Sequence, residues 1–106
     1  MSTERTLQTP DIRSIADTLR RAKPYLRERY NVREIGIFGS YARNEQTAGS
    51  DVDILVDLAE PIGWDVVDLK DELEQLLGLP VDLVLKGGIA RRPKLLQSIR
   101  EDATYV

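Results

Sequence analysis

The 106-residue sequence contains no cysteine and no histidine. Without cysteine, neither a disulfide framework nor a thiolate zinc site can form. Without histidine, a general base has to be a carboxylate, a lysine or a tyrosine, and a divalent metal ion has to be one that accepts oxygen ligands, such as Mg²⁺. The chemistry open to this chain is therefore that of carboxylates, amines and hydroxyl groups.

The sequence also lacks a long apolar run and an excess of positive charge. No stretch approaches the roughly 20 apolar residues that a membrane-spanning helix needs, and the polar N-terminus does not have the pattern of a signal peptide. Fifteen basic residues against eighteen acidic ones give a net charge of −3. This balance disfavours non-specific nucleic-acid binding, which depends on neutralising phosphates. We therefore expect a cytoplasmic protein that binds neither membranes nor nucleic acid directly.

The composition, 42% hydrophobic and 31% charged, is that of an ordinary folded domain. A chain of this length buries somewhat over ~60% of its unfolded surface, which allows a core without covalent cross-links. Neither a repeat nor a linker divides it. We expect residues 1–106 to form a single α/β (α+β) domain, with residues 1–8 flexible. About three strands would form a mixed sheet, with helices mainly on one face and an acidic site on the other.

The hydrophobic pattern predicts the individual elements. Apolar residues at helical spacing predict a first helix that begins at Pro10 after an N-cap at Thr9, with a kink or restart at Pro24. Further helices are predicted at residues 40–45, at residues 64–77 with Gly78 as C-cap, and from about Pro93 onward. Alternating patterns predict strands at residues 33–38, 51–58 and 80–85, and residues 103–106 are expected to form an extended tail.

The strand predicted at residues 51–58 reads DVDILVDL and carries acids on one face. Because alternate side chains of a strand point the same way, Asp51, Asp53, Leu55 and Asp57 fall opposite the apolar even-numbered residues. Like charges repel by roughly 4 kcal/mol at ~4 Å if the effective dielectric constant is ~20. Such a face either meets open water or holds a cation. Asp51 and Asp53 suit two oxygen ligands on one Mg²⁺, whereas Asp57, nearer the far strand end, is expected to face solvent.

Two further features belong with this acidic pair. Gly39 and Ser40 follow the apolar strand at residues 33–38. A glycine there lets backbone amides approach a ligand closely, and a helix starting just after it directs free N–H groups at an anion. Asp82 interrupts another apolar strand. If that strand neighbours residues 51–58, three carboxylates converge on one side of the sheet.

Each of these features also has a simpler structural explanation. A Gly-Ser pair between a strand and a helix is usually only a turn, and an Asp-x-Asp pair at a strand start is often solvated or capping. Asp82 could be an edge-strand charge that blocks aggregation. Arg43 could merely pair with Glu45 or Asp51. What these explanations account for poorly is the combination of all the features.

The stretch FGSYARNEQTAGSDVDILV, residues 38–56, combines them in one pattern. It resembles the signature of the DNA polymerase β-like nucleotidyltransferase superfamily, in which Gly-Ser after an apolar residue is followed, about ten residues later, by Asp-x-Asp. Within that superfamily, G-S-x-A-R followed by S-D-x-D resembles the minimal nucleotidyltransferase (MNT) family, the MntA-type antitoxins paired with HEPN-domain toxins. The resemblance covers nearly the whole chain. It departs at Asn44, where the family usually has glycine, but asparagine tolerates left-handed backbone angles better than most residues.

The resemblance implies a role for each motif residue. Gly39 and Ser40 would hold the triphosphate of ATP, and Arg43 would also lie in the nucleotide site. The acids would ligate Mg²⁺, with two ions expected, and form the catalytic triad: Asp51, Asp53 and Asp82. A hydroxyl group would attack the α-phosphorus and release pyrophosphate, with Asp82 as the best candidate for general base. Because clustered acids raise one another's pKa, metal binding is expected to strengthen with rising pH.

The acceptor of the nucleotide is the least determined part of the prediction. We expect no additional substrate domain in a chain of this length, so the acceptor would be a separate molecule. The resemblance implies that it is a tyrosine of a HEPN toxin, to which this antitoxin transfers AMP. Two alternatives remain: a non-catalytic antitoxin that neutralises its toxin by contact, and a small-molecule nucleotidyltransferase of the antibiotic-modifying kind. Trp64 is either an anchor for a partner or a cap on the core.

Overall fold

The computed structural model describes residues 10–106, so the predictions for residues 1–8 and for Thr9 lie outside the described residues. Its elements, in chain order, are α1 (Ile12–Tyr30), β1 (Val32–Phe38), α2 (Gly39–Ala42), β2 (Val52–Leu58), α3 (Asp65–Leu77), β3 (Val81–Leu85), the 3₁₀ helix η2 (Lys86–Ile89), α4 (Pro93–Asp102) and β4 (Thr104–Tyr105). Across residues 10–106, no helix combines the length and apolar character needed to cross a membrane.

The strands form one four-stranded sheet in the order β3-β2-β1-β4. Strand β1 is antiparallel to β2 and to β4, whereas β2 and β3 run parallel and are connected through α3. The predicted α/β class and mixed sheet are thus confirmed. The fourth strand is found where the sequence suggested an extended tail, because Thr104 and Tyr105 pair with Ile37 and Gly36 of β1.

The end of the chain is held by two further contacts. The Val106 amide donates a hydrogen bond to the Ile35 carbonyl oxygen at 3.0 Å. The carbonyl oxygen of Val106 accepts a hydrogen bond from Lys23 Nζ at 2.8 Å. Backbone pairing and a side-chain donor from α1 therefore fix this short edge strand against the sheet.

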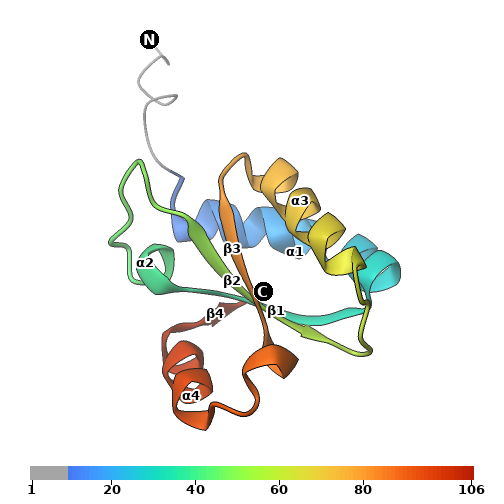
Figure 1. Ribbon diagram of the computed structural model, residues 1–106. Helices are drawn as coiled ribbons and strands as arrows, with labels where there is room; N and C mark the ends of the chain where they lie inside the picture. Colours follow the sequence, from blue (N-terminus) through green and yellow to red (C-terminus); the bar gives the residue numbers. More distant parts are fainter. Residues whose placement is uncertain (1–9) are drawn as a thin grey trace.

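The main core lies between one face of the sheet and helices α1 and α3 (Figure 1). Each element contributes apolar side chains at its expected spacing, among them Leu19 and Leu26 of α1, Val52, Ile54 and Val56 of β2, and Leu69 and Leu73 of α3. Helix α4 lies on the opposite side of the sheet (Figure 1). There Leu55 and Ile99 are buried. The face that carries the acids is therefore partly covered, which the alternating pattern alone did not indicate.

Helix α1 differs from its prediction at two prolines. The helix begins at Ile12 rather than at Pro10, with Asp11 as the N-cap, whose Oδ1 accepts a hydrogen bond from the Ser14 amide at 3.0 Å. The predicted kink or restart at Pro24 is wrong, because α1 continues through that residue. Pro24 is exposed, so water can bind the carbonyl group that the missing N–H leaves without a partner, while buried residues on either side keep both halves in one core.

Two other side chains differ from their predictions. Asp57 does not face open solvent: its side chain is 17% exposed, and its Oδ2 accepts a hydrogen bond from Arg33 Nε at 3.1 Å. Trp64 does not cap the core, because it is 91% exposed. By contrast, α3 ends as predicted, with Gly78 in the left-handed conformation (φ +68°) that favours glycine.

Leu73→Ala tests the packing of α3 on the sheet. Leu73 is fully buried, so its truncation should lower the free energy of unfolding by about 2–5 kcal/mol. Val67→Ala on the same helix is a matched control, since Val67 is 57% exposed and its truncation should cost less than about 0.5 kcal/mol. Urea denaturation followed by circular dichroism measures both. Equal losses for the two variants would contradict the packing described.

Candidate active site

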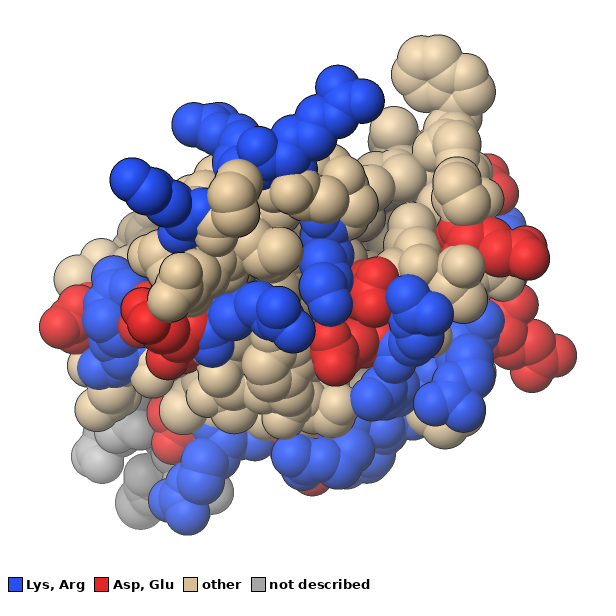
Figure 2. All heavy atoms as spheres, turned by 90° about the horizontal axis from the view of Figure 1, so that it is seen from below, with Lys and Arg blue, Asp and Glu red and all other residues tan. Residues whose placement is uncertain are grey.

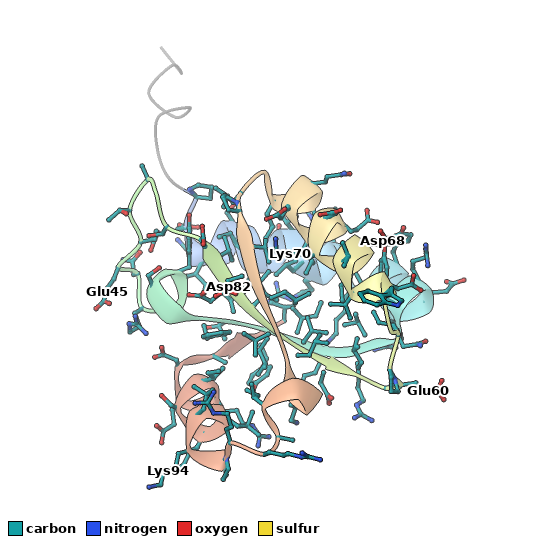
Figure 3. The ribbon with its side chains drawn as sticks, in the orientation of Figure 1. Glu45, Glu60, Asp68, Lys70, Asp82 and Lys94 are labelled. Atoms are coloured by element: carbon teal, nitrogen blue, oxygen red, sulfur yellow. The ribbon has the colours of Figure 1, made fainter. Side chains whose placement is uncertain are left out.

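The pairing of β2 with β3 brings Asp53 beside Asp82. The two residues are direct partners in the parallel register, and partners on neighbouring strands direct their side chains to the same face. Figure 3 shows Asp82 on β3, at the end of the sheet near α2. The pKa of Asp53 is raised, first by burial and then by the charge and hydrogen bonding of Asp82. The two carboxyl groups therefore meet on one face, as the sequence predicted if the strands were neighbours.

Asp51 lies at the edge of the site formed by Asp53 and Asp82. It is exposed and lies one residue before β2, and its negative charge also raises the pKa of Asp53. Within residues 10–106, no three acidic side chains are already arranged to hold a metal ion. The structure thus brings two of the predicted acids together and leaves the third close enough to act on Asp53 through its charge.

The donor set nevertheless fits a hard divalent cation. Carboxylate oxygens are the ligands that Mg²⁺ prefers, and a cation would relieve the repulsion that raises the pKa of Asp53. The side chain of Asp51 is exposed, and an exposed side chain can change rotamer to turn toward the pair. Asp53, Asp82 and Asp51 could therefore hold such an ion together.

Gly39 lies directly against the Asp53 carboxylate. A Cβ atom on Gly39 would lie 2.0 Å from Asp53 Oδ2 and 3.0 Å from its Cγ. Gly39 also has φ +73°, in the left-handed region that other residues rarely adopt. Glycine is therefore favoured here for two reasons, the positive φ and the lack of room for a Cβ atom beside the Asp53 side chain.

Ser40 and Asn44 shape the turn that follows. Ser40 is half-buried next to Gly39, and its carbonyl oxygen accepts a hydrogen bond from the Glu45 amide at 2.8 Å. Asn44 has φ +59°, so the left-handed turn expected at this position is present although glycine is absent. The Gly-Ser motif and the Asp-x-Asp motif are thereby folded onto one end of the sheet.

Arg43 is held by two acids at the edge of the site. Its Nε donates a hydrogen bond to Glu45 Oε1 at 3.0 Å, and its Nη1 pairs with Asp102 at the C-terminal end of α4. Of the two partners considered from the sequence, Glu45 is the one observed. The positive charge of Arg43 lowers the pKa of Asp53, although by less than Asp82 and Asp51 raise it. Asp102 was missed, because no local motif links it to Arg43, and only the packing of α4 brings the two together.

Comparison with known proteins identifies this arrangement. The sequence profile of the family described as "Nucleotidyltransferase domain" matches residues 19–106. A Methanocaldococcus jannaschii protein named as a candidate protein adenylyltransferase, MJ0128, is 52% identical over 90% of this chain and 97% of its own length. The protein adenylyltransferase MntA of Thermococcus cleftensis is 44% identical over 90% of this chain and 95% of its own.

Solved structures agree with the sequence relatives. A structure described as a candidate minimal nucleotidyltransferase has a TM-score of 0.75 and 33% identity, covering 92% of this chain and 97% of that one. A toxin–antitoxin structure with AMP-PNP has a TM-score of 0.53 and 31% identity, covering 62% of this chain and 55% of that one. The chain therefore belongs to the nucleotidyltransferase domain family, as a minimal nucleotidyltransferase similar to proteins named protein adenylyltransferases.

Proposed function

We propose that this chain transfers AMP from ATP to a tyrosine hydroxyl of a partner HEPN toxin in a Mg²⁺-dependent reaction, and so acts as the antitoxin. The observation that carries the proposal is the pairing of Asp53 with Asp82, with the Asp53 carboxylate lying against Gly39. The names of its relatives support protein adenylylation. The toxin–antitoxin structure with AMP-PNP supports both a toxin partner and a nucleotide substrate.

In this proposal, the residues at the site divide the work between nucleotide and metal. Gly39 and Ser40 bind the triphosphate of ATP through backbone amides and the serine hydroxyl, with Arg43 at the edge of the same site. Three acids would hold two Mg²⁺ ions: Asp51, Asp53 and Asp82. When bound, magnesium supplies the positive charge that offsets the charge of the triphosphate and the carboxylates.

The chain's own groups position the reactants and move the proton. The backbone at Gly39 fixes the α-phosphate beside the acids, and Asp82 accepts the proton of the attacking tyrosine hydroxyl. Pyrophosphate then leaves on the side opposite the new bond. Most of the rate enhancement comes from orientation and charge neutralisation rather than from a covalent intermediate.

The face of the molecule that α4 covers carries many positive charges (Figure 2). Figure 2, which views the molecule from the side of α4, shows many Lys and Arg side chains on this face. Arg91, Arg92, Lys94 and Arg100 of this region are exposed. Although the whole chain has a net charge of −3, this local positive charge raises the concentration of a polyphosphate near the molecule.

One observation favours the alternative of a non-catalytic antitoxin that acts by direct contact. Trp64 is 91% exposed, and an exposed tryptophan is a frequent anchor at protein interfaces. It follows β2, at the opposite end of that strand from Asp53. A toxin could therefore be held there whether or not AMP is transferred.

A transfer assay distinguishes catalysis from contact. The chain is incubated with Mg²⁺, ATP and the purified HEPN toxin, and the toxin is weighed by mass spectrometry. We expect an increase of one or more AMP units that disappears in Asp51→Asn/Asp53→Asn and persists in Asp17→Asn/Asp71→Asn, which removes two exposed charges elsewhere. Toxin that is neutralised by the Asp51/Asp53 variant without any mass change would instead establish the contact mechanism.

Gly39→Ala tests the close approach of the backbone to the acids. The new Cβ would displace the Asp53 carboxylate, and a misplacement of about 1 Å is enough for a loss near 10²-fold in kcat/KM. Gly63→Ala is the matched control, since Gly63 also has a positive φ but nothing lies within 4 Å of an added Cβ. Both variants should lose about 1–2 kcal/mol of stability, yet only Gly39→Ala should lose activity. Similar activities would refute the role of Gly39.

Asp53→Asn tests the electrostatic cost of the site. In the folded state, burial and Asp82 raise the pKa of Asp53 above the ordinary value of 3.8 that it has in the unfolded chain. At a pH between the ordinary and the raised pKa, the folded state therefore binds more protons than the unfolded state. The contribution of Asp53 to stability is thus lost as the pH rises through the raised pKa. In EDTA, the variant should be more stable than the wild type at neutral pH, with a difference that narrows on acidification. Thermal melts across this pH range measure it, and a less stable variant at neutral pH would contradict the prediction.

A further inference from the structure

The chain contains four tyrosines, all within the described residues, and the fold gives them different environments. Tyr30 and Tyr41 are buried, with 3% and 1% of their surface exposed. Tyr25 is 50% exposed, but it belongs to α1, and its hydroxyl donates to Glu72 Oε1 of α3 at 3.2 Å. Both helices lie on the sheet face opposite the acids (Figure 1). The fourth tyrosine is Tyr105 of β4, which is 39% exposed.

The strand register places Tyr105 on the face of the active site. Tyr105 pairs with Gly36, and Gly36 pairs with Leu55, which follows Asp53 by two positions and so shares its face. The ring itself confirms this direction, since a Cβ on Gly36 would lie 3.1 Å from Tyr105 Cε1. Thr104, by contrast, points to the other face and lines a hollow with the first turns of α1.

Tyr105 is near the acids within this face. Two strand spacings and two residues along the strands separate it from Asp53, which corresponds to roughly 12 Å between Cα atoms. Within residues 10–106, no hydrogen bond holds the hydroxyl of Tyr105 in place. Strand β4 has only two residues, so this edge of the sheet opens locally once the contacts of Val106 with Ile35 and Lys23 break.

We propose that Tyr105 is an acceptor site of this enzyme, which attaches AMP to a tyrosine of its own chain. This inference rests on the proposed function, because it uses the same site and the same nucleoside triphosphate. The Tyr105 ring leaves Gly36, and its phenolic oxygen forms a bond to the α-phosphorus of ATP. The bond from that phosphorus to the bridging oxygen breaks, pyrophosphate leaves with the electron pair, and a site carboxylate takes the phenolic proton.

The modification would change the sheet edge. A nucleotide attached to the hydroxyl adds a negative charge and a group much bulkier than the tyrosine ring. The modified side chain would no longer pack flat over Gly36, where the ring lies so close that a Cβ added to the glycine would be 3.1 Å from it. Self-modification would therefore release β4 from β1 and alter the surface beside the active site.

The experiment uses the full chain with Mg²⁺ and ATP labelled at the α-phosphate, without any partner. We expect one AMP per chain, located on Tyr105 by peptide mass mapping. Tyr105→Phe keeps the ring that covers Gly36 and should reduce incorporation at least tenfold, whereas Tyr25→Phe should incorporate as the wild type does. Circular dichroism verifies that both variants fold. Label on another residue, or equal label in Tyr105→Phe, would overturn the proposal.

Two further experiments distinguish a failure of this inference from a failure of the proposed function on which it rests. A parallel reaction contains the purified HEPN toxin: label on the toxin with none on Tyr105 refutes self-modification alone, and label on neither refutes both. Tenfold dilution of the enzyme should leave the first-order rate constant unchanged, because the acceptor and the site belong to one chain. A rate constant that falls with dilution would refute this intramolecular transfer.

Discussion

The site depends on one close contact: the carboxyl group of Asp53 is held between Asp82 on the neighbouring strand and the backbone of Gly39. Burial and the nearby acids raise the pKa of Asp53, so the folded, metal-free protein bears an electrostatic cost at this point. The apolar core on the other face of the sheet, between the strands and helices α1 and α3, stabilises the strands that enforce this contact. The repulsion between the carboxyl groups therefore persists in the folded protein.

Local sequence patterns predicted most of the fold and the motifs of the site. Strands β1, β2 and β3, helix α3 with its end at Gly78, and the start of α4 at Pro93 all follow from alternation, helical spacing and cap residues. The convergence of Asp53 with Asp82 required one assumption, that β2 and β3 are neighbours, which the sheet confirms. The family resemblance added the chemistry that the patterns alone left open.

What the sequence did not reveal depends on contacts between distant segments. Pro24 does not break α1, because packing on both sides holds one continuous helix. The tail became β4 because β1 has a free edge and Lys23 reaches Val106. Arg43 meets Asp102 only after α4 has folded back across the sheet. In each case the deciding partner is too far away along the chain for a local pattern to indicate it.

The parallel pairing of β2 with β3 has a consequence for synthesis of the protein. A parallel neighbour cannot be added through a tight hairpin, so the whole of α3 has to emerge between the two strands. A nascent chain still on the ribosome that ends within α3 possesses Asp53 but not Asp82. The acidic pair forms only when translation has passed β3, so an incomplete product carries the Gly-Ser bend without a functioning centre.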